Sequence, residues 1–285
     1  MIPVLLQIGP LKLYSYGLMM ALGFLAADLV IASECRRRGL SRDYATSMVL
    51  WAAGAGLAGA RLYDVIDNWP AYAAEPWSIL FSASGFVWYG GLIGGLMGVS
   101  LAARRYRVGL WTTADMCGPA LALGQAIGRL GCQLSGDGDW GLPSRLPWAM
   151  SYPNAIVGWN ASTVLKLDAA GQLVSGYFPG VRVHPAPLYE FALYVAIFGL
   201  LWRLRRSSAP EGRLFCLYLV LAGAARFLVE FVRINPRVFY GLSEAQIIAV
   251  VMMAAGGAGL WLLARRGAAA PLAPDHALHP VGDGT

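Results

Sequence analysis

The stretch ALALGQAIGRLGCQL (Ala120–Leu134) decides the fold, because it closes an apolar segment long enough to cross a membrane and carries an arginine, Arg129, near its end. It opens into SGDGDWG (Ser135–Gly141). A guanidinium group within a hydrocarbon span is energetically unfavourable, so an arginine there usually marks a functional site. A second apolar stretch carries Arg226 and Glu230. Two such arginines, flanked by glycines and carboxylates, indicate a pocket for an anionic lipid head group.

The composition places the whole chain in a membrane. Of 285 residues, 57% are hydrophobic and only 13% are charged, whereas soluble domains carry roughly 25% charged residues. Apolar stretches of about 20 residues are long enough to span a bilayer as helices. Such stretches predict an all-α polytopic protein of seven transmembrane helices, at 14–34, 45–66, 86–103, 113–134, 186–202, 214–232 and 244–264.

The arginines predict the orientation. Thirteen of the 22 basic residues follow odd-numbered spans, and six lie on the other side, spread over longer loops. By the positive-inside rule, the N-terminus is outside and the C-terminus is in the cytoplasm. The net charge of +6 therefore reflects topology, and nucleic acid is not an expected partner. We expect a multi-pass membrane protein that acts as a monomer.

The sequence divides into a membrane domain and smaller segments. Residues 1–266 form a single seven-helix domain, within which 67–85 is a predicted interfacial arm, because its tryptophans and tyrosine suit the lipid interface. Residues 135–185 form a small extracytoplasmic head, with short β-strands predicted on either side of Asp168–Gly171. Residues 267–285 are predicted to be a disordered cytoplasmic tail. The four cysteines show no paired spacing, so no disulfide, metal site or cofactor is expected.

The predicted topology brings the polar groups of the spans to one end. Arg129 falls near the outer end of the fourth span, and Arg226 and Glu230 fall in the outer half of the sixth. Their spacing of four residues puts them on one helix face, which Arg233 extends. Two alternatives stay open: Arg226 and Glu230 could be a structural ion pair, and Arg129 could extend its charge to the interface. The glycines after Tyr89 could serve only tight helix packing.

Seven motifs in this order resemble the prolipoprotein diacylglyceryl transferase family. The resemblance covers nearly the whole chain, and its specificity lies in the order and spacing of the motifs. They are LYSYG (13–17), GARLY (59–63), YGGLIG (89–94), GRLG (128–131) leading to Gly136 and Asp137, HPAPLYE (184–190), RFLVEFVR (226–233) and GLSEAQ (241–246).

The resemblance implies a multi-pass protein of the bacterial inner membrane, with its reaction in the outer leaflet. The family moves the diacylglyceryl group of phosphatidylglycerol to the lipobox cysteine thiol of a prolipoprotein, which forms a thioether and releases glycerol phosphate. Phosphatidylglycerol, lipobox-containing prolipoproteins and membrane lipids are thus the expected partners. Arginine suits the phosphate, because its guanidinium binds oxyanions bidentately and stays protonated. The residues implied as catalytic are Arg129, Arg226, Tyr89, Asp137 and Glu230. Those implied as substrate-binding are Tyr16, Arg61, Gly90, Gly91, Cys132, Ser135, Gly136, Tyr189, Glu190, Arg233 and Gln246.

The chain departs from the family pattern at several positions. Tyr89 stands where the family usually has histidine, and tyrosine, with a pKa near 10, is a poor base at neutral pH. Cys132 and Ser135 stand where asparagines are usual, and Asp137 where glutamate is usual. Either the base is dispensable or relocated, or the chain is a divergent paralogue that binds anionic phospholipid without, or with altered, transferase activity.

Other classes of seven-helix protein fit poorly. A retinal protein needs a lysine in its last span, and the two lysines of this chain, Lys12 and Lys166, lie elsewhere. An intramembrane serine protease needs a histidine within a span, and His184, His276 and His279 fall outside all seven. A transporter stays open, because buried charges also line transport paths.

Overall fold

A bundle of long helices carries a small head of loops at one end. The computed structural model describes residues 1–9, 11–74, 87–160, 180–207 and 209–268. Two antiparallel strand pairs accompany the helices: β1 (Val4–Ile8) with β2 (Leu11–Tyr14), and β3 (Arg237–Phe239) with β4 (Leu242–Ser243). The described helices are α1 (Ser15–Arg37), α2 (Arg42–Asp67), α3 (Trp69–Ala74), α5 (Trp88–Arg105), α6 (Leu110–Ser135), α8 (Ala186–Leu204), α9 (Arg213–Val229), the 3₁₀ helix η1 (Glu230–Val232) and α10 (Glu244–Ala268).

Each of the seven predicted spans is a helix, with ends that differ from the predicted ones by a few residues. The ends follow local chemistry. Helix α6 stops at Gly136, which adopts the left-handed conformation (φ +65°) that favours glycine. Helix α2 begins after Ser41, whose side chain accepts a hydrogen bond from the Asp43 amide. The β1–β2 hairpin before α1 was not predicted.

Five of these helices are long and apolar enough to cross a membrane: Ser15–Arg37, Arg42–Asp67, Ala186–Leu204, Arg213–Val232 and Glu244–Arg265. The chain is therefore a polytopic membrane protein. Helices α5 and α6 do not reach the same hydropathy, because five glycines and two arginines lie in α5 and several glycines and polar side chains lie in α6. The number of seven spans and their orientation stay predictions.

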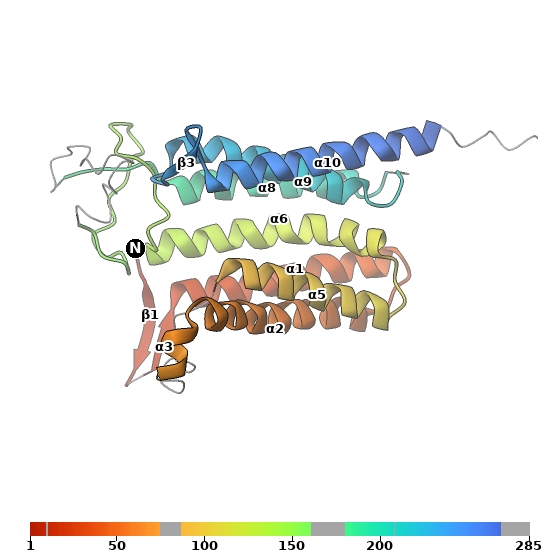
Figure 1. The fold of residues 1–285 in the computed structure, drawn as a ribbon, viewed down its shortest axis with the longest axis horizontal. Coiled ribbons are helices and arrows are strands. Elements are labelled where there is room, and N and C mark those ends of the chain that lie inside the picture. The colour runs from red at the N-terminus through yellow and green to blue at the C-terminus, as the bar shows by residue number, and fades with distance from the viewer. Residues whose placement is uncertain (10, 75–86, 161–179, 208, 269–285) are drawn as a thin grey trace, which may run out of the picture.

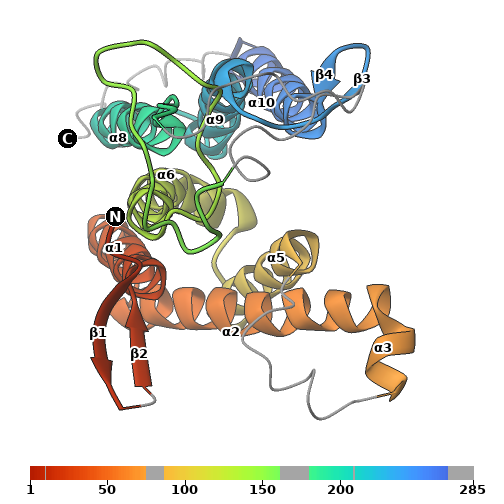
Figure 2. The ribbon, with the colours of Figure 1, turned by 90° about the vertical axis from the view of Figure 1, so that its left-hand side faces the viewer.

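Helix α6 lies at the centre of the bundle. In Figure 1 most of the long helices run along the long axis, whereas Figure 2 shows α2 crossing this direction. In Figure 2 α6 separates α1, α2 and α5 from α8, α9 and α10. Helix α6 contributes buried side chains to two apolar clusters. Met116 and Ala120 pack with residues of α1 and α2, whereas Ala122 and Ala126 pack with residues of α8 and α9. The segment that carries Arg129 thus contacts both halves of the molecule.

Helices α2 and α5 approach closely through small residues. A Cβ atom added at Gly90 would lie 2.2 Å from the Gly59 carbonyl oxygen, and one added at Gly94 would lie 2.1 Å from that of Ala55. Small side chains let helix backbones pack this tightly in membranes. The YGGLIG motif therefore has the packing role that the sequence left open.

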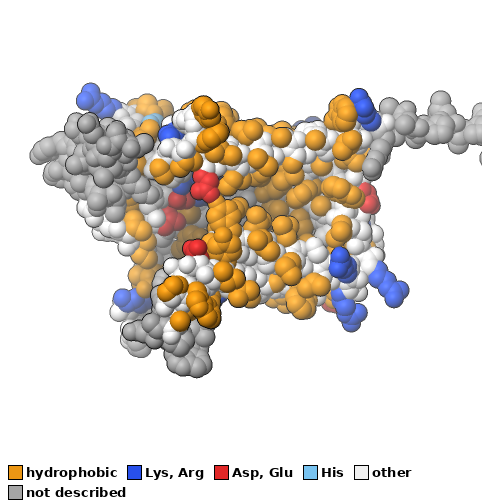
Figure 3. Space-filling view, in the orientation of Figure 1, with side chains coloured by type: hydrophobic (Ala, Val, Ile, Leu, Met, Phe, Trp, Pro, Cys, Tyr) orange, Lys and Arg blue, Asp and Glu red, His pale blue; other side chains and the backbone are white. Residues whose placement is uncertain are grey.

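The head lies at the same end of the bundle as the N-terminus (Figure 1). Its described part has an aromatic core of Trp140, Tyr152 and Trp159, with ring centroids 5.1–5.6 Å apart. Val183 packs in the same cluster. Basic side chains mark the opposite end, and apolar side chains cover the flank between (Figure 3). The predicted hairpin around 168–171, residues 75–85 of the predicted arm and residues 269–285 of the predicted tail lie outside the described residues.

Candidate functional site

Three arginines and three carboxylates meet at the end of the bundle that carries the head. They come from α6, the loop after it, α8, and the end of α9 with the residues that follow. In Figure 3 acidic side chains show at a hollow beside the head. The three positive and three negative charges balance, as burial requires, because an unpaired charge away from water is strongly unfavourable. This arginine cluster consists of Arg129, Arg226, Arg233, Asp139, Glu190 and Glu230.

Glu190 bridges the arginines of two helices. Its side chain, near the start of α8, has no solvent exposure. Its Oε2 lies 2.7 Å from Nε of Arg129, and its Oε1 accepts a hydrogen bond of 2.6 Å from Nη1 of Arg226. Nη1 of Arg233 lies 3.5 Å from Oε2. One carboxylate therefore holds Arg129 and Arg226 within reach of a single small anion.

Asp139 pairs with two of the three arginines of the cluster. Its two oxygens contact Arg129 and Arg233, the latter at 2.5 Å from Nη2. Partial burial opposes the ionisation of Asp139, but Arg233 and Arg129 together lower its pKa to about 2. The carboxylate is therefore charged at any physiological pH.

Glu230 completes the cluster from η1. Its Oε2 lies 2.9 Å from Nη2 of Arg226, at the predicted spacing of four residues. Asn235 donates to its Oε1 at 2.6 Å. Nearby, Arg237 donates to the Glu230 carbonyl oxygen at 3.2 Å and to Oε1 of the fully buried Gln246 at 2.6 Å. Gln246 thus lies outside the cluster and is connected to Glu230 through Arg237.

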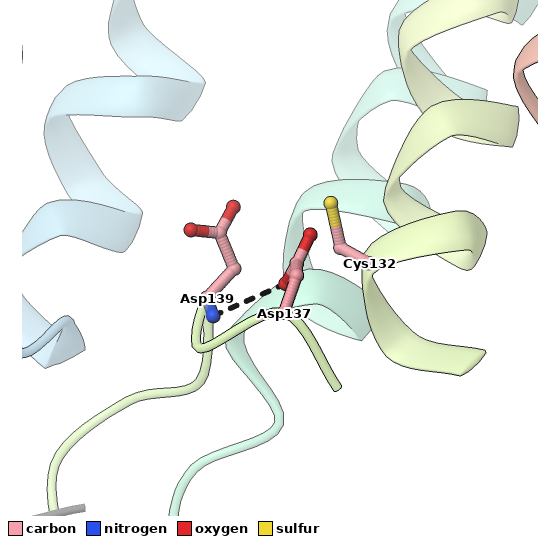
Figure 4. A group of neighbouring side chains, drawn as sticks. All are labelled: Cys132, Asp137 and Asp139. Atoms are coloured by element: carbon pink, nitrogen blue, oxygen red, sulfur yellow. Dashed lines mark hydrogen bonds between the residues drawn. The ribbon is translucent and has the colours of Figure 1, made fainter. Parts of the chain in front are cut away.

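Cys132 and Asp137 lie next to Arg129. The sulfur of Cys132 is 3.8 Å from Nη1 of Arg129 and lies within 4.8 Å of a carboxylate oxygen of Asp137. Figure 4 shows Cys132 on α6 with Asp137 and Asp139 on the loop that follows. The Asp139 amide donates to Oδ1 of Asp137 at 3.2 Å. Burial, followed by the charge of Asp139, raises the pKa of Asp137.

The grouping of Cys132, Asp137 and Asp139 also resembles a metal-ligand set, since their sulfur and oxygen atoms lie within 4.8 Å of one another. Two observations argue against this use. Asp139 already contacts two arginines, and the guanidinium of Arg129 lies beside the sulfur, where it would repel a cation. We therefore assign these groups to the arginine cluster and its surroundings.

Tyr16, Ser135 and Gly136 also lie next to this region. Tyr16 of α1 packs on Gly131 of α6, where an added Cβ would lie 3.4 Å from its ring. Its phenol interacts electrostatically with Cys132, Asp137 and Arg129. Ser135 is buried and donates to the Cys132 carbonyl oxygen at 3.4 Å. A Cβ at Gly136 would lie 2.7 Å from the Cα of Ala155, so glycine is needed for the turn that presents Asp137.

The residues predicted from the second and third spans lie elsewhere. Tyr89 is 40% exposed and stacks on Tyr63 of α2 at 6.3 Å between ring centroids. Gly90 and Gly91 face α2. The Arg61 guanidinium lies 5.9 Å from the centroid of the Tyr72 ring. Among the described residues, no hydrogen bond or ion pair joins Tyr89, Gly90 or Gly91 to the arginine cluster.

Tyr189 forms a separate polar group beside the cluster. Its hydroxyl accepts a hydrogen bond of 2.8 Å from Nε1 of Trp148 and lies 3.1 Å from Nδ1 of His184. It therefore connects the head to the start of α8, one residue before Glu190.

Sequence reasoning did not assign roles to Asp139, Asn235 or Arg237. The sequence could have indicated Asp139, since this residue follows Asp137 by two residues in a glycine-rich loop next to a buried arginine. No sequence pattern indicates Asn235 or Arg237, because their partners, Glu230 and Gln246, come within reach only when the chain turns back after η1.

Comparison with known proteins agrees with the geometry. A family model described as prolipoprotein diacylglyceryl transferase matches residues 3–262. Three similar relatives bear the name phosphatidylglycerol–prolipoprotein diacylglyceryl transferase. The protein of Bordetella parapertussis is 35% identical over 280 residues, which cover 93% of this chain and 95% of the relative. That of Pseudomonas paraeruginosa is 33% identical, with 95% and 97% covered, and that of Gloeobacter violaceus is 30% identical, with 93% and 94% covered. Both the family model and these relatives span almost the whole chain, and this chain therefore belongs to the prolipoprotein diacylglyceryl transferase family.

Proposed function

We propose that this protein transfers the diacylglyceryl group of phosphatidylglycerol to the lipobox cysteine thiol of lipoprotein precursors, forming a thioether and releasing glycerol phosphate. Membership of the family and the names of its relatives support this activity. They do not favour the alternative of a lipid-binding paralogue without transferase activity.

The pairing of Arg129 and Arg226 through Glu190 is the observation that carries the proposal for this chain. Two guanidiniums that contact one carboxylate are close enough to contact one phosphate. Each guanidinium has five N–H donors in a planar fork, so donors remain after Glu190 is satisfied. In our proposal both arginines hold the lipid phosphate and stabilise the charge that develops on it as it leaves.

The other residues of the cluster act through these two in our proposal. Glu230 positions Arg226, which it contacts at 2.9 Å. Asp139, itself paired with Arg233, contacts Arg129 and fixes the position of its guanidinium. Cys132, Ser135, Gly136 and Tyr16 shape the lipid pocket beside Asp137, while Tyr189 and Gln246 support α8 and α9. We further propose that Arg61, Tyr89, Gly90 and Gly91 face lipid that approaches between helices.

The proposed setting is the outer leaflet of a bacterial inner membrane. Seven spans with the N-terminus outside would put the arginine cluster and the head on the outer side, where precursors arrive. The exposed apolar side chains along α2, α5 and α10, such as Leu57, Leu96 and Val251, suit contact with lipid tails.

A transfer assay tests the activity. Purified protein in phosphatidylglycerol vesicles is incubated with a lipobox peptide, and label from the lipid is followed to the peptide cysteine. We expect transfer by the natural sequence and at least a 100-fold loss in Arg129→Ala, since removing one transition-state donor has effects of about this size. Arg129→Lys should also lose most activity, because lysine keeps the charge without the bidentate fork.

Arg105→Ala is the matched control, since Arg105 is exposed at the opposite end of the bundle. Its activity should equal that of the unaltered protein. Binding of phosphatidylglycerol without transfer by the unaltered protein would overturn the proposed activity.

A further inference from the structure

The proposed reaction needs a group that accepts the thiol proton. A free cysteine has a pKa of about 8.5 and is mostly protonated at neutral pH, whereas the thiolate is the nucleophile. A base must lie within hydrogen-bond reach of the thiol, roughly 2.6–3.2 Å between heavy atoms. The inference below rests on the proposed function and identifies this base among the described residues.

Three of the four carboxylates around Arg129 are engaged by arginines. Asp139 and Glu230 each contact two guanidiniums, and Glu190 contacts three. These three carboxylates therefore hold arginines in place, and their oxygens already accept from guanidinium groups.

Asp137 differs from them in its contacts. Among the described residues, no ion pair within 4.0 Å joins its carboxylate to an arginine. The Asp139 amide donates to its Oδ1, and the sulfur of Cys132 lies within 4.8 Å of a carboxylate oxygen. An ionised carboxylate offers about four acceptor sites, so Asp137 keeps capacity for an incoming donor. It is half-buried and lies beside Cys132 (Figure 4).

Cys132 places a thiol within 4.8 Å of this carboxylate and 3.8 Å from Nη1 of Arg129. Cys132 itself is a poor candidate for the nucleophile. If its sulfur took the diacylglyceryl group, the product would be a thioether, and a second thiol would have to displace sulfur from carbon. We therefore assign Cys132 the role of holding Asp137 beside Arg129.

We propose that Asp137 is the general base that takes the proton from the lipobox cysteine thiol of the substrate. The S–H bond breaks, and its proton passes to a carboxylate oxygen of Asp137. The sulfur electron pair forms a bond to the glycerol carbon of the diacylglyceryl group. The bond from that carbon to the phosphate oxygen breaks, and its electron pair leaves on the oxygen. Glycerol phosphate departs with one more negative charge than the diester carried, beside Arg129 and Arg226, and the proton then passes from Asp137 to this phosphate or to water.

The pH dependence follows from the groups that face Asp137. They are Tyr16 from α1, Arg129 and Cys132 from α6, and Asp139 and Tyr152 from the head. Burial and the charge of Asp139 raise the pKa of Asp137, against the opposing effects of Cys132 and Arg129. Below that pKa the base is protonated and inactive. Transfer should therefore rise with pH through the pKa of Asp137 and then level off.

The test compares Asp137→Asn and Asp137→Glu with the unaltered protein in the vesicle assay, over pH 4 to 9. Asp137→Asn should lower kcat at pH 7 by about 100-fold or more, the usual effect of a general base, with the KM for phosphatidylglycerol within about threefold. Its low-pH limb should disappear, and its rate should instead climb with thiol ionisation toward pH 9. Asp137→Glu should keep most of the activity and shift the midpoint of the limb. The exposed Asp43→Asn, at the opposite end of the bundle, should match the unaltered protein.

A peptide with selenocysteine in place of the lipobox cysteine separates a base from a structural residue. A selenol is ionised at neutral pH and needs no base, so the 100-fold defect of Asp137→Asn should shrink to a few-fold with this peptide. A defect of equal size with both peptides, or an Asp137→Asn profile identical to that of the unaltered protein, would overturn the inference. If Asp137→Asn does not fold, Asp137→Glu provides the test. A low-pH midpoint of its activity equal to that of the unaltered protein would then overturn the inference. Failure of the proposed function is a different result, in which the unaltered protein transfers nothing to either peptide.

Discussion

Glu190 contacts all three arginines of the cluster through two carboxylate oxygens, from a fully buried position on α8. Its role is both electrostatic and geometric. It neutralises guanidiniums that would otherwise face an apolar interior, and it sets the separation of Arg129 and Arg226. Removing one partner of a buried ion pair is strongly destabilising, even where the pair itself contributes little.

Glu190→Gln should therefore destabilise the protein by about 3–5 kcal/mol, the range for breaking a buried ion pair. The glutamine keeps the volume and the hydrogen-bonding oxygen but removes the charge. Thermal unfolding in detergent measures the loss, and transfer activity should fall with it. Glu211→Gln, at an exposed position between α8 and α9, should leave the melting temperature within about a degree. An unchanged melting temperature for Glu190→Gln would show that water or lipid compensates the arginines.

Asp139 should contribute stability that is lost in acid. Its folded pKa, about 2, lies below the unfolded value near 3.9. The contribution is thus fully present above about pH 4 and disappears as the pH falls toward 2. Its size is roughly 2 kcal/mol or less, because the side chain is partly exposed. The difference in unfolding free energy between the unaltered protein and Asp139→Asn should shrink across this range. A difference that stays constant from pH 5 to 2 would contradict the pairing with Arg129 and Arg233.

At the scale of elements, the helices are joined by two kinds of contact. Helices α2 and α5 pack backbone to backbone through glycines. Helices α6 and α9 are joined by Asp115, whose oxygens accept from the amides of Gly212 at 2.8 Å and Phe215 at 3.0 Å. A carboxylate from one helix thereby satisfies the free N–H groups at the start of another. Both contacts join helices without involving a side chain of the arginine cluster.

Gly94→Ala should weaken the α2–α5 contact. The new methyl group would lie 2.1 Å from the Ala55 carbonyl oxygen, which is backbone and has little freedom to move. We expect destabilisation of about 1–3 kcal/mol, the usual effect of overpacking, measured as a lower melting temperature in detergent. Gly54→Ala is the matched control. It lies on the same helix pair with nothing within 4 Å of its added Cβ, and it should be neutral or slightly stabilising because alanine favours the helix. Equal melting temperatures for the two variants would contradict the close approach.

At the scale of the whole molecule, the head, the N-terminus and the arginine cluster lie at one end, and basic clusters from three connections lie at the other (Figures 1 and 3). This polarity is what the positive-inside rule expects of a protein whose site opens on the outer side. Glu34 near the end of α1 pairs there with Arg37, Arg38 and Arg205, so part of that basic end is itself neutralised.

Single cysteines test the orientation. Arg145→Cys in the head and Glu211→Cys between α8 and α9 are both exposed. A membrane-impermeant maleimide applied to spheroplasts should label the first, and it should label the second only after the membrane is permeabilised. The unaltered protein, whose four cysteines are buried or half-buried, gives the background. Labelling of Glu211→Cys alone in intact spheroplasts would reverse the proposed topology.

The sequence alone determined the helices and the identity of the key arginines. Apolar length is a local property, so the seven helical stretches were predicted within a few residues of their ends. Arg129 and Arg226 stood out because charge in an apolar span is unfavourable without a partner. The i, i+4 pair of Arg226 and Glu230 was likewise local to one helix, and the structure contains it.

Only the tertiary structure decided which groups meet. Glu190 bridges Arg129 and Arg226 because α8 and α9 pack next to each other against α6, and no local pattern encodes that approach. The same packing engages Asp139 with two arginines and leaves Asp137 beside Cys132 without an ion pair among the described residues. It also places Tyr89 against Tyr63 of α2. Charge partners far apart in sequence are selected by how helices pack, because a buried charge takes whichever opposite charge the fold brings within reach.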